Sequence, residues 1–338
     1  MKCADPVLCY TIGEKRLFRN FRLASPVAKQ FHDLVFNCGK CIFCRKKRAF
    51  ELAIRCVLHA SLYKENCFLT LTYDETKPSY HNNFQYEDIQ KFKKKLRSHV
   101  WRKFQERIQV FNVHEYGRNG KKHWHLVVFN YSPHQEPDQK GEPDCRVHSR
   151  SNGISLYVSK TLSKLWTYGF STVGDISEAS AMYAAQYNQK DFKNGNITNG
   201  KKSHSKHSGI GKQYFLKHYK QILSLGFIPF ETKKIPIPRY FHKIAHKHYS
   251  HFYESDNFFD LPYRKRLYTP FKQGEANLEI AELFVKYLNI RKEKIEQLTL
   301  DWEETINKYI FTNEKPDFMI SAENYLYDLK NKLTKESF

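Results

Sequence analysis

Two histidines one residue apart, His123 and His125, are the part of this sequence with the clearest chemical meaning. Side chains alternate between the two faces of a β-strand, so both imidazoles would lie on the same face of a strand over residues 122–130. A second strand-like run, 107–116, precedes them, carries Glu115 near its end and is separated from them by a turn-like segment. A hairpin of the two runs would therefore bring Glu115 beside the histidines. Two imidazoles and a carboxylate suit a divalent cation that keeps open coordination positions. The alternative is a pair of half-exposed polar residues on a solvent face.

A second candidate site lies further along the chain, in the segment 180–190. Its residues favour a helix, because they include several strong helix formers and neither Gly nor Pro. Tyr183 and Tyr187 are four residues apart and Lys190 follows three residues later, so the three side chains share one helical face. Tyrosines at helical spacing usually pack in a core, but a lysine on the same face indicates contact with solvent. The segment therefore predicts two phenols and an amine on one accessible surface.

Together these motifs resemble those of the HUH endonuclease superfamily, in which a His-hydrophobic-His strand is followed by a helix with Tyr-x-x-x-Tyr and a nearby lysine. More narrowly, the chain is similar to the replication initiator proteins of the microviruses, small circular single-stranded DNA phages, and to their gokushovirus-like branch in particular. Five stretches carry the match, in the right order over roughly the first 190 residues: 38–45, 53–56, 67–74, 114–117 with 123–125, and 183–190.

The resemblance implies both an activity and a cofactor. It implies a rolling-circle replication initiator, an endonuclease and strand transferase that nicks and rejoins single-stranded DNA at the phage origin through a 5′-phosphotyrosyl intermediate. Carried over to this chain, the resemblance assigns the ligands of a Mg²⁺ or Mn²⁺ ion to His123, His125 and Glu115. It assigns the nucleophiles to Tyr183 and Tyr187.

The chemistry of tyrosine explains why such an enzyme needs a metal. A phenol has a pKa near ~10 and is a weak nucleophile at neutral pH unless the phosphate that it attacks is polarised. Rolling-circle replication needs one nick to start and a second to release a unit circle. Two hydroxyls one helical turn apart, ~5–6 Å, can both visit one site. Lys190, on the same face, would neutralise the phosphate or donate a proton to the leaving oxygen.

The composition agrees with a nucleic-acid partner. Lys and Arg total 56 and Asp and Glu total 35, which gives a formal net charge of +21, and aromatic residues make up 15% of the chain. A charge of this size favours a polyanionic partner. Basic residues interleaved with aromatic ones suit single-stranded DNA, because phosphates meet the cations and bases stack on the rings. The expected partner is single-stranded or supercoiled circular phage DNA at its origin.

The sequence also predicts a soluble protein with no membrane partner. No run approaches the ~20 apolar residues needed to span a bilayer, and the first residues lack the apolar stretch of a signal peptide. We therefore expect the protein in the cytoplasm of the infected bacterial host. No helicase motif is visible, so the resemblance implies that a host helicase and the host replication machinery act with it.

Three cysteines at regular spacing, Cys38, Cys41 and Cys44, form a further candidate site. An intracellular protein keeps its thiols reduced, so this spacing suits a structural Zn²⁺ better than disulfides, provided that a fourth ligand arrives. The candidates for the fourth ligand share no recognisable spacing; they are Cys3, Cys9, Cys56 and His59. The alternative is a set of reduced, partly buried thiols without a metal.

Two groups of basic residues are expected to contact DNA phosphates. The first follows the cysteines directly and consists of Arg45, Lys46, Lys47 and Arg48. The second lies in the polar and basic segment 190–212 and includes Lys193, Lys201 and Lys202. For the first group, the alternative is an ordinary solvated face of a helix.

The order of the expected elements predicts an α+β fold. Strand, helix, strand, strand, helix, strand and helix are expected over 67–73, 86–104, 107–116, 122–130, 155–166, 170–176 and 180–190. This is the order of a split βαβ, ferredoxin-like antiparallel sheet flanked by helices. It is also the nuclease fold of the HUH superfamily that the chain resembles. Residues 132–153, which are polar and contain several Pro and Gly, are expected to form a long loop.

Three parts are expected along the chain. They are a Cys-containing basic N-terminal segment (1–65), a nuclease core (66–212) and a mainly helical C-terminal region (213–338). The first 37 residues are expected to hold loops and a short strand. Helical periodicity predicts helices over about 45–63, 213–225, 238–253, 275–308 and 321–333.

Other functions fit parts of the pattern. A non-catalytic basic protein that binds single-stranded DNA and holds a structural metal would need the tyrosine helix only for packing. An HUH-type transposase of the single-tyrosine kind would lack the second tyrosine, so Tyr187 favours the replication initiator. A histidine-triad hydrolase would need a third histidine where this chain has Val127.

Overall fold

The structure of the protein is a computed structural model. It describes residues 3, 6–12, 15–20, 34–77, 85–117, 120–137, 140–151, 153–186, 203–204, 209–253, 271, 274–292 and 304. The chain divides into two compact units. The smaller consists of residues 1–48, 223–228 and 246–338, and the larger of residues 49–222 and 229–245.

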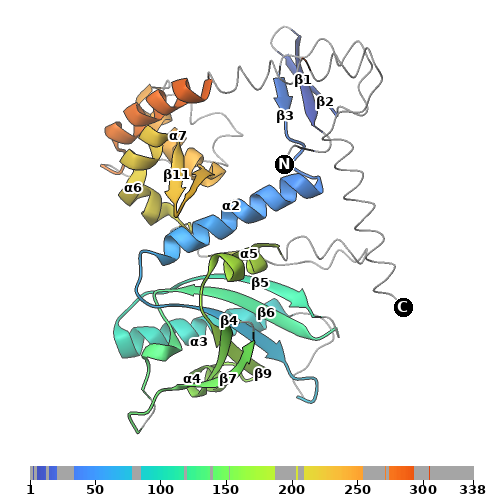
Figure 1. The fold of residues 1–338 in the computed structure, drawn as a ribbon, viewed down its shortest axis with the longest axis vertical. Coiled ribbons are helices and arrows are strands. Elements are labelled where there is room, and N and C mark those ends of the chain that lie inside the picture. The colour runs from blue at the N-terminus through green and yellow to red at the C-terminus, as the bar shows by residue number, and fades with distance from the viewer. Residues whose placement is uncertain are drawn as a thin grey trace. The chain divides into compact units, whose positions relative to one another are not determined.

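A seven-stranded antiparallel sheet forms the centre of the larger unit (Figure 1). Its strand order is β10-β5-β6-β4-β9-β8-β7. The bounds of the strands, in that order, are Ser203–His204, Gln109–Tyr116, Lys122–Phe129, Asn66–Tyr73, Gly169–Gly174, Ile154–Ser159 and Cys145–Ser151. Long strands that are rich in β-branched and aromatic residues therefore occupy the middle of the sheet, and a two-residue strand lies at one edge.

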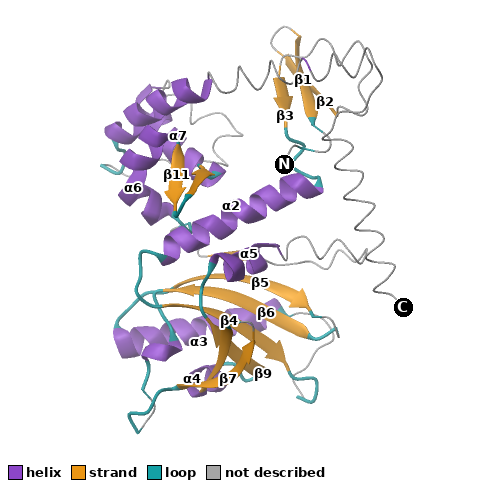
Figure 2. Cartoon of the chain, in the orientation of Figure 1, coloured by secondary structure: helices purple, strands orange, loops and turns teal. Residues whose placement is uncertain are grey.

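Four of these strands and three helices confirm the predicted element order. Along the chain the order is β4, α3 (Tyr86–Phe104), β5, β6, α4 (Lys160–Leu165), β9 and α5 (Glu178–Gln186). In space the four strands are ordered β5-β6-β4-β9, so the first and third of them lie in the centre, as in a ferredoxin-like sheet. The mixture of helices and antiparallel strands confirms the α+β class (Figure 2).

The segment 140–159 differs from its prediction. Instead of a long loop and a helix from about Ser155, the chain forms the hairpin β7–β8, and α4 begins only at Lys160. Apolar residues at 154, 156 and 158 alternate with polar ones, and that period of two suits a strand rather than a helix. Gly153, with a φ of +75°, adopts the left-handed conformation in the turn of the hairpin. The hydroxyl of Ser159 accepts the N–H of Leu162 at 3.0 Å and starts the short helix.

Two apolar layers cover the sheet, one on each face. On one face, side chains of β4 and β6 such as Leu71 and Trp124 pack in a buried cluster with Phe92 of α3 and Trp166. On the opposite face, Val127 packs in a second cluster with residues of α5 and of α2, which spans Ile42–Ala60. The apolar stripe on α3 predicted from its helical spacing is buried against the sheet.

Alternation along β4 and β6 decides which polar side chains face α5. The burial of β4 alternates at every residue. Leu69 and Leu71 enter the cluster with α3. The intervening Thr70 and Thr72 therefore point to the other face. On β6, Trp124 enters the same cluster as Leu71, so the odd-numbered residues of β6 point toward the face that α5 covers.

The smaller unit begins with a three-stranded antiparallel sheet of order β2-β1-β3. Its strands are Lys15–Asn20, Val7–Ile12 and Leu34–Phe36, where loops and a short strand are expected. The C-terminal region is largely helical, as predicted, with α6 (Lys212–Leu225), α7 (Arg239–Tyr253) and a helix over 278–292. A small unpredicted hairpin, β11 (Phe227–Phe230) and β12 (Lys233–Pro236), lies between α6 and α7. The predicted helix 321–333 lies outside the described residues. Within the described part of the chain, no helix combines the length and the apolar character needed to cross a membrane.

Candidate active site

The hairpin β5–β6 places the three predicted metal ligands next to one another. Its register pairs Glu115 with His123 and Val113 with His125. The turn is closed by the N–H of Gly117, which donates to the carbonyl of Lys121 at 2.8 Å. Directly paired residues on neighbouring strands project to the same face, so the carboxylate and both imidazoles lie on the face of the sheet that α5 covers.

Glu115 and His125 are already in contact. Nε2 of His125 lies 2.9 Å from Oε2 of Glu115, and both side chains are almost fully buried. His123 is half-buried, and its ring stacks beside that of His125 with 6.2 Å between centroids. A buried carboxylate needs a partner of this kind, because burial without a hydrogen bond or a cation would be costly. The arrangement therefore holds a hard oxygen ligand and a nitrogen ligand at hydrogen-bonding distance.

Each imidazole is also held from behind by a threonine of β4. Oγ1 of Thr70 lies 3.1 Å from Nδ1 of His125, and Oγ1 of Thr72 lies 2.9 Å from Nδ1 of His123. The register pairs the same residues across β4 and β6. Because a hydroxyl can donate or accept, it can serve either tautomer of the ring. Both Nε2 atoms are thereby left on the side away from β4.

The electrostatic setting of His123 favours the neutral ring. Burial of the imidazole, helped by the neighbouring His125, lowers the pKa of His123 below its usual value, and the Glu115 carboxylate only partly opposes this effect. A neutral imidazole has a free lone pair on one ring nitrogen, and that lone pair is what a metal ion binds. His123 is therefore suited to the role of a ligand at neutral pH.

The helix predicted to carry the nucleophiles packs on the same face. α5 contacts β5 and β6, and Ala181 and Ala184 lie in the apolar cluster on that face. Its start is capped reciprocally: the N–H of Ser180 donates to Oγ of Ser177 at 3.1 Å, and the N–H of Ser177 donates to Oγ of Ser180 at 2.8 Å. The backbone of Tyr183 lies in α5, between the two buried alanines.

Several predicted site residues lie outside what the structure describes. They are the side chain of Tyr183 and the whole of Tyr187, Lys190, Lys193, Lys201 and Lys202. The basic run Arg45, Lys46, Lys47 and Arg48 forms the first turns of α2. The three predicted zinc ligands, Cys38, Cys41 and Cys44, lie close together, and Cys3 joins them.

The described residues contain one group in which three or more metal-ligand atoms all lie within 4.8 Å of one another, and it is the group of four cysteines. The ligand atoms of Glu115, His123 and His125 are adjacent but less tightly gathered, with the carboxylate bonded to His125. Their chemistry nevertheless fits a divalent cation, because two neutral imidazoles and a carboxylate with aligned outer hydrogen bonds form a familiar ligand set.

Sequence reasoning did not identify Thr70 and Thr72 as part of this site. The alternation over 67–73 placed both on one face, and that was the available signal. Which face meets the histidines depends on β4 lying beside β6, a pairing between segments more than fifty residues apart, and the spacing of residues along one strand carries no information about it.

Comparisons with known proteins agree with this site. Residues 66–192, which include β4, β5, β6, β9 and α5, match the family described as Replication-associated protein ORF2. The chain is 32% identical to Replication-associated protein ORF4 of Chlamydia phage 1, over 71% of this chain and 60% of that protein. The chain therefore aligns with less than two thirds of the length of this relative.

Two further relatives are matched over more of their length. Replication-associated protein VP4 of Bdellovibrio phage phiMH2K is 31% identical over 64% of this chain and 69% of its own length. Replication-associated protein ORF2 of Spiroplasma virus 4 is 24% identical over 99% of this chain and 98% of its own. No solved structure matches the chain at a significant level. From the shared site, the fold and these identities we conclude that the chain belongs to the replication-associated protein family of the microviruses.

Proposed function

We propose that this protein initiates rolling-circle replication by nicking and rejoining single-stranded DNA at a phage origin, with a tyrosine as nucleophile and Mg²⁺ or Mn²⁺ as cofactor. One observation carries the proposal: the Glu115, His123 and His125 side chains share one face of the sheet, and α5, the helix that bears Tyr183, packs on that face. The names of the relatives support a role in replication.

Glu115, His123 and His125 would hold the cation. When bound, it would polarise the scissile phosphate and stabilise the charge that develops in the transition state. For His125 to become a ligand, its Nε2 must give up the hydrogen bond to Glu115, and the ring proton then belongs on Nδ1. Thr70 is positioned to accept that proton at 3.1 Å, so the change of tautomer leaves no ring nitrogen without a partner.

The tyrosine supplies the covalent step. The phenol oxygen of Tyr183 or Tyr187 attacks the phosphorus in line, the bond from phosphorus to the 3′ oxygen breaks, and the 3′ oxygen leaves as a hydroxyl after taking up a proton. We assign delivery of this proton to Lys190. The 5′ end remains on the tyrosine as a phosphodiester, so rejoining by attack of a 3′ hydroxyl needs no nucleotide cofactor.

Two tyrosines allow the reaction to run twice. While one holds the 5′ end of the displaced strand, the other attacks the regenerated origin and releases a unit circle. The large positive charge of the chain suits the polyanionic substrate. A host helicase would separate the strands ahead of the polymerase in this scheme.

The test is the formation of a covalent protein–DNA adduct. Wild-type protein is incubated with single-stranded oligonucleotides that tile the phage genome, with Mg²⁺, Mn²⁺ or EDTA, and analysed on a denaturing gel. We expect an adduct with one oligonucleotide only, dependent on metal and lost in His125→Ala. Tyr183→Phe and Tyr187→Phe should each retain some adduct, and the double variant should retain none. Tyr253→Phe, a half-exposed tyrosine of α7, is the matched control and should behave as wild type.

The outcomes separate this proposal from its rivals. DNA binding in a gel-shift assay with no adduct under any metal would contradict the nuclease and favour a non-catalytic protein that binds single-stranded DNA. An adduct that depends on a single tyrosine for every step would contradict the two-nucleophile scheme and favour the reaction of a single-tyrosine transposase.

A further inference from the structure

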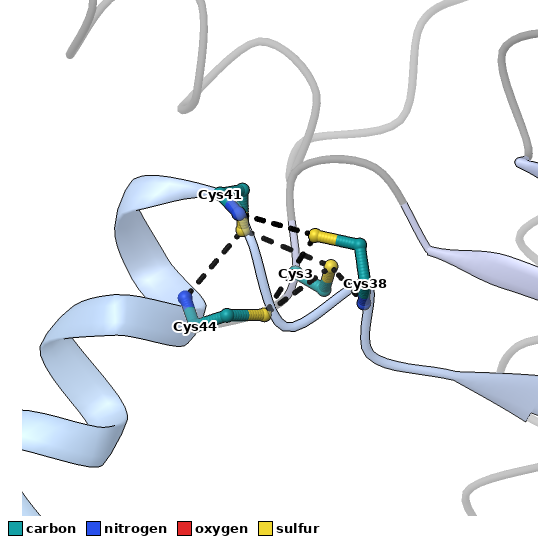
Figure 3. A group of neighbouring side chains, drawn as sticks. All are labelled: Cys3, Cys38, Cys41 and Cys44. Atoms are coloured by element: carbon teal, nitrogen blue, oxygen red, sulfur yellow. Dashed lines mark hydrogen bonds between the residues drawn. The ribbon is translucent and has the colours of Figure 1, made fainter. Parts of the chain in front are cut away.

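The four cysteines that gather at the start of α2 form a second site, in the smaller unit and independent of the proposed nuclease chemistry. Figure 3 shows the side chains of Cys3, Cys38, Cys41 and Cys44 pointing toward a common centre. The Sγ atom of Cys3 lies 3.8 Å from that of Cys41 and 3.6 Å from that of Cys44, and the Sγ atoms of Cys38 and Cys44 are 4.0 Å apart. We propose that these residues bind one structural Zn²⁺, with Cys3 as the fourth ligand.

The distances between the sulfur atoms match a tetrahedral zinc site. A Zn–S bond is about 2.3 Å long, so two sulfurs of a regular ZnS₄ tetrahedron lie ~3.8 Å apart. The three distances, 3.6, 3.8 and 4.0 Å, bracket this value. They are far longer than the ~2.05 Å of a disulfide bond, and all eight cysteines of the chain are free thiols. A four-iron cluster would hold its cysteine sulfurs at the corners of a much larger body, so the spacing favours a single ion.

The backbone around the sulfurs is folded as a metal site requires. The N–H groups of Lys40 and Cys41 donate to Sγ of Cys38 at 3.4 and 3.2 Å. The N–H of Cys44 donates to Sγ of Cys41 at 3.5 Å, and the N–H of Cys38 donates to Sγ of Cys3 at 3.3 Å. Hydrogen bonds to sulfur partly offset the negative charge of thiolates, which is the form that binds zinc.

Charges nearby in the sequence complement such a site. Four thiolates and one Zn²⁺ carry a net charge of −2, and the basic run Arg45 to Arg48 follows the last ligand directly. The guanidinium of Arg48 donates to the carbonyl of Gly39, which lies between the first two ligands of the loop. Gly39 has a φ of +70°, a left-handed conformation that a glycine adopts without strain, so the loop can bend around the ion.

The smaller unit gives the metal a clear structural role. Cys3 precedes β1, Cys38 follows β3, and the other two ligands lie at the start of α2, so one ion would tie both ends of the small sheet to the helix. That sheet has a modest core of its own, because Leu17 and Phe18 of β2 are 50% and 58% exposed. Small elements with little buried apolar surface commonly depend on a metal or disulfides for stability.

The other candidates for the fourth ligand are engaged elsewhere. Cys56 is buried in the apolar cluster under α5. His59 is fully buried, and its Nε2 bonds to the side chain of Gln109 at 3.0 Å. Cys9 is buried in β1 and does not belong to the group of converging sulfurs. Geometry thus singles out Cys3, the candidate most distant in sequence from the other three ligands.

The first experiment measures metal content in the purified full-length protein by plasma mass spectrometry. We expect a stoichiometry near ~1 zinc per chain, retained in Cys145→Ser, which removes a half-buried thiol outside the group. Cys3→Ser and Cys41→Ser should each lose most of the zinc. Protein without bound metal, or with iron in place of zinc, would contradict the proposal, and so would a Cys3→Ser variant that keeps full zinc occupancy.

A second measurement uses only wild-type protein and so does not depend on the folding of variants. The protein is alkylated before and after treatment with a zinc chelator, and the labelled cysteines are identified by mass spectrometry. We expect Cys3, Cys38, Cys41 and Cys44 to become reactive together on chelation, while the buried Cys67 reacts only after denaturation. Labelling of the four without chelator would overturn the proposal. Replacement of zinc by Co²⁺ should give the intense sulfur-to-metal charge-transfer absorption of a tetrathiolate site.

Discussion

The hydroxyl oxygen of Thr70 on β4 lies 3.1 Å from Nδ1 of His125 on β6, on the side of the ring opposite to Glu115. The imidazole is therefore held at both nitrogens, by a hydroxyl that can donate or accept and by a carboxylate that only accepts. A ring held in this way has little rotational freedom, so a ligand nitrogen is oriented before any metal arrives. Thr72 holds His123 in the same manner at 2.9 Å.

We predict that Thr70→Val and Thr72→Val weaken metal use without abolishing the reaction. Loss of the hydroxyl leaves Nδ1 without its partner, and changes behind a metal ligand typically cost 10–100-fold in metal affinity or activity, so the Mn²⁺ concentration for half-maximal adduct should rise about 10–100-fold. Excess Mn²⁺ should restore the yield. Thr70→Ser keeps the hydroxyl and serves as the control. An unchanged metal requirement in Thr70→Val would show that the hydrogen bond has no positioning role.

Gly117 at the hairpin turn leaves room for His123. A Cβ at this position would lie 2.7 Å from Nε2 of His123, so Gly117→Ala must push the ring away. We expect the variant to need about 10-fold more metal for adduct formation. Gly120→Ala, three residues on in the same turn, meets no neighbouring atom within 4 Å but strains a backbone with a φ of +73°. This control should lose stability and keep its metal requirement, and the opposite result would refute the steric argument.

Gly169, at the start of β9, is packed against the backbone of β4. A Cβ there would clash with the carbonyl of Thr72 and lie 2.6 Å from the nitrogen of Asp74, and neither atom can move without disturbing the sheet. Gly169→Ala should lower the free energy of unfolding by ~1–3 kcal/mol or more, measured by urea denaturation. At the other end of the strand, a Cβ on Gly174 meets only a side-chain methyl of Leu156 at 3.4 Å. Gly174→Ala should therefore change stability by less than ~1 kcal/mol.

Glu136 is a buried carboxylate that should make stability depend on acid pH. Burial by itself would raise the pKa of this carboxyl, but hydrogen bonds from Tyr131, Lys103 and His99 outweigh it and hold the pKa below its ordinary value. A group whose pKa is lower in the folded state stabilises the fold above its unfolded pKa, ~4.3 for Glu, and loses that contribution as the pH falls through the folded pKa.

We therefore expect Glu136→Gln to lower the free energy of unfolding by about 1.5–3 kcal/mol at pH 7. The difference from wild type should shrink as the pH falls below ~4. Urea denaturation of both proteins at several pH values measures it, with Glu142→Gln, an exposed carboxylate, as the control. A difference that stays constant with pH would show that the charge of Glu136 contributes nothing.

Local periodicity was sufficient for much of this protein. The placement of His123 and His125 on one face follows from the two-residue repeat of a strand, and the stripe on α3 follows from the 3.6-residue repeat of a helix. The hairpin that pairs Glu115 with His123 joins neighbouring segments. These features depend on residues close in sequence, whose geometry the backbone itself limits, and they could be predicted from the chain alone. Where two periodicities competed, as over 154–159, the prediction was wrong.

Only the tertiary structure decided which distant segments meet. The pairing of β4 with β6 brings Thr70 and Thr72 behind the two histidines. The convergence at the start of α2 selects Cys3 from four candidates, 35 residues before the next ligand. Such contacts are set by how apolar surfaces pack over the whole domain and by which closed loops that packing compensates. The spacing of residues along a segment records the face on which each side chain lies but not the neighbour that this face will meet.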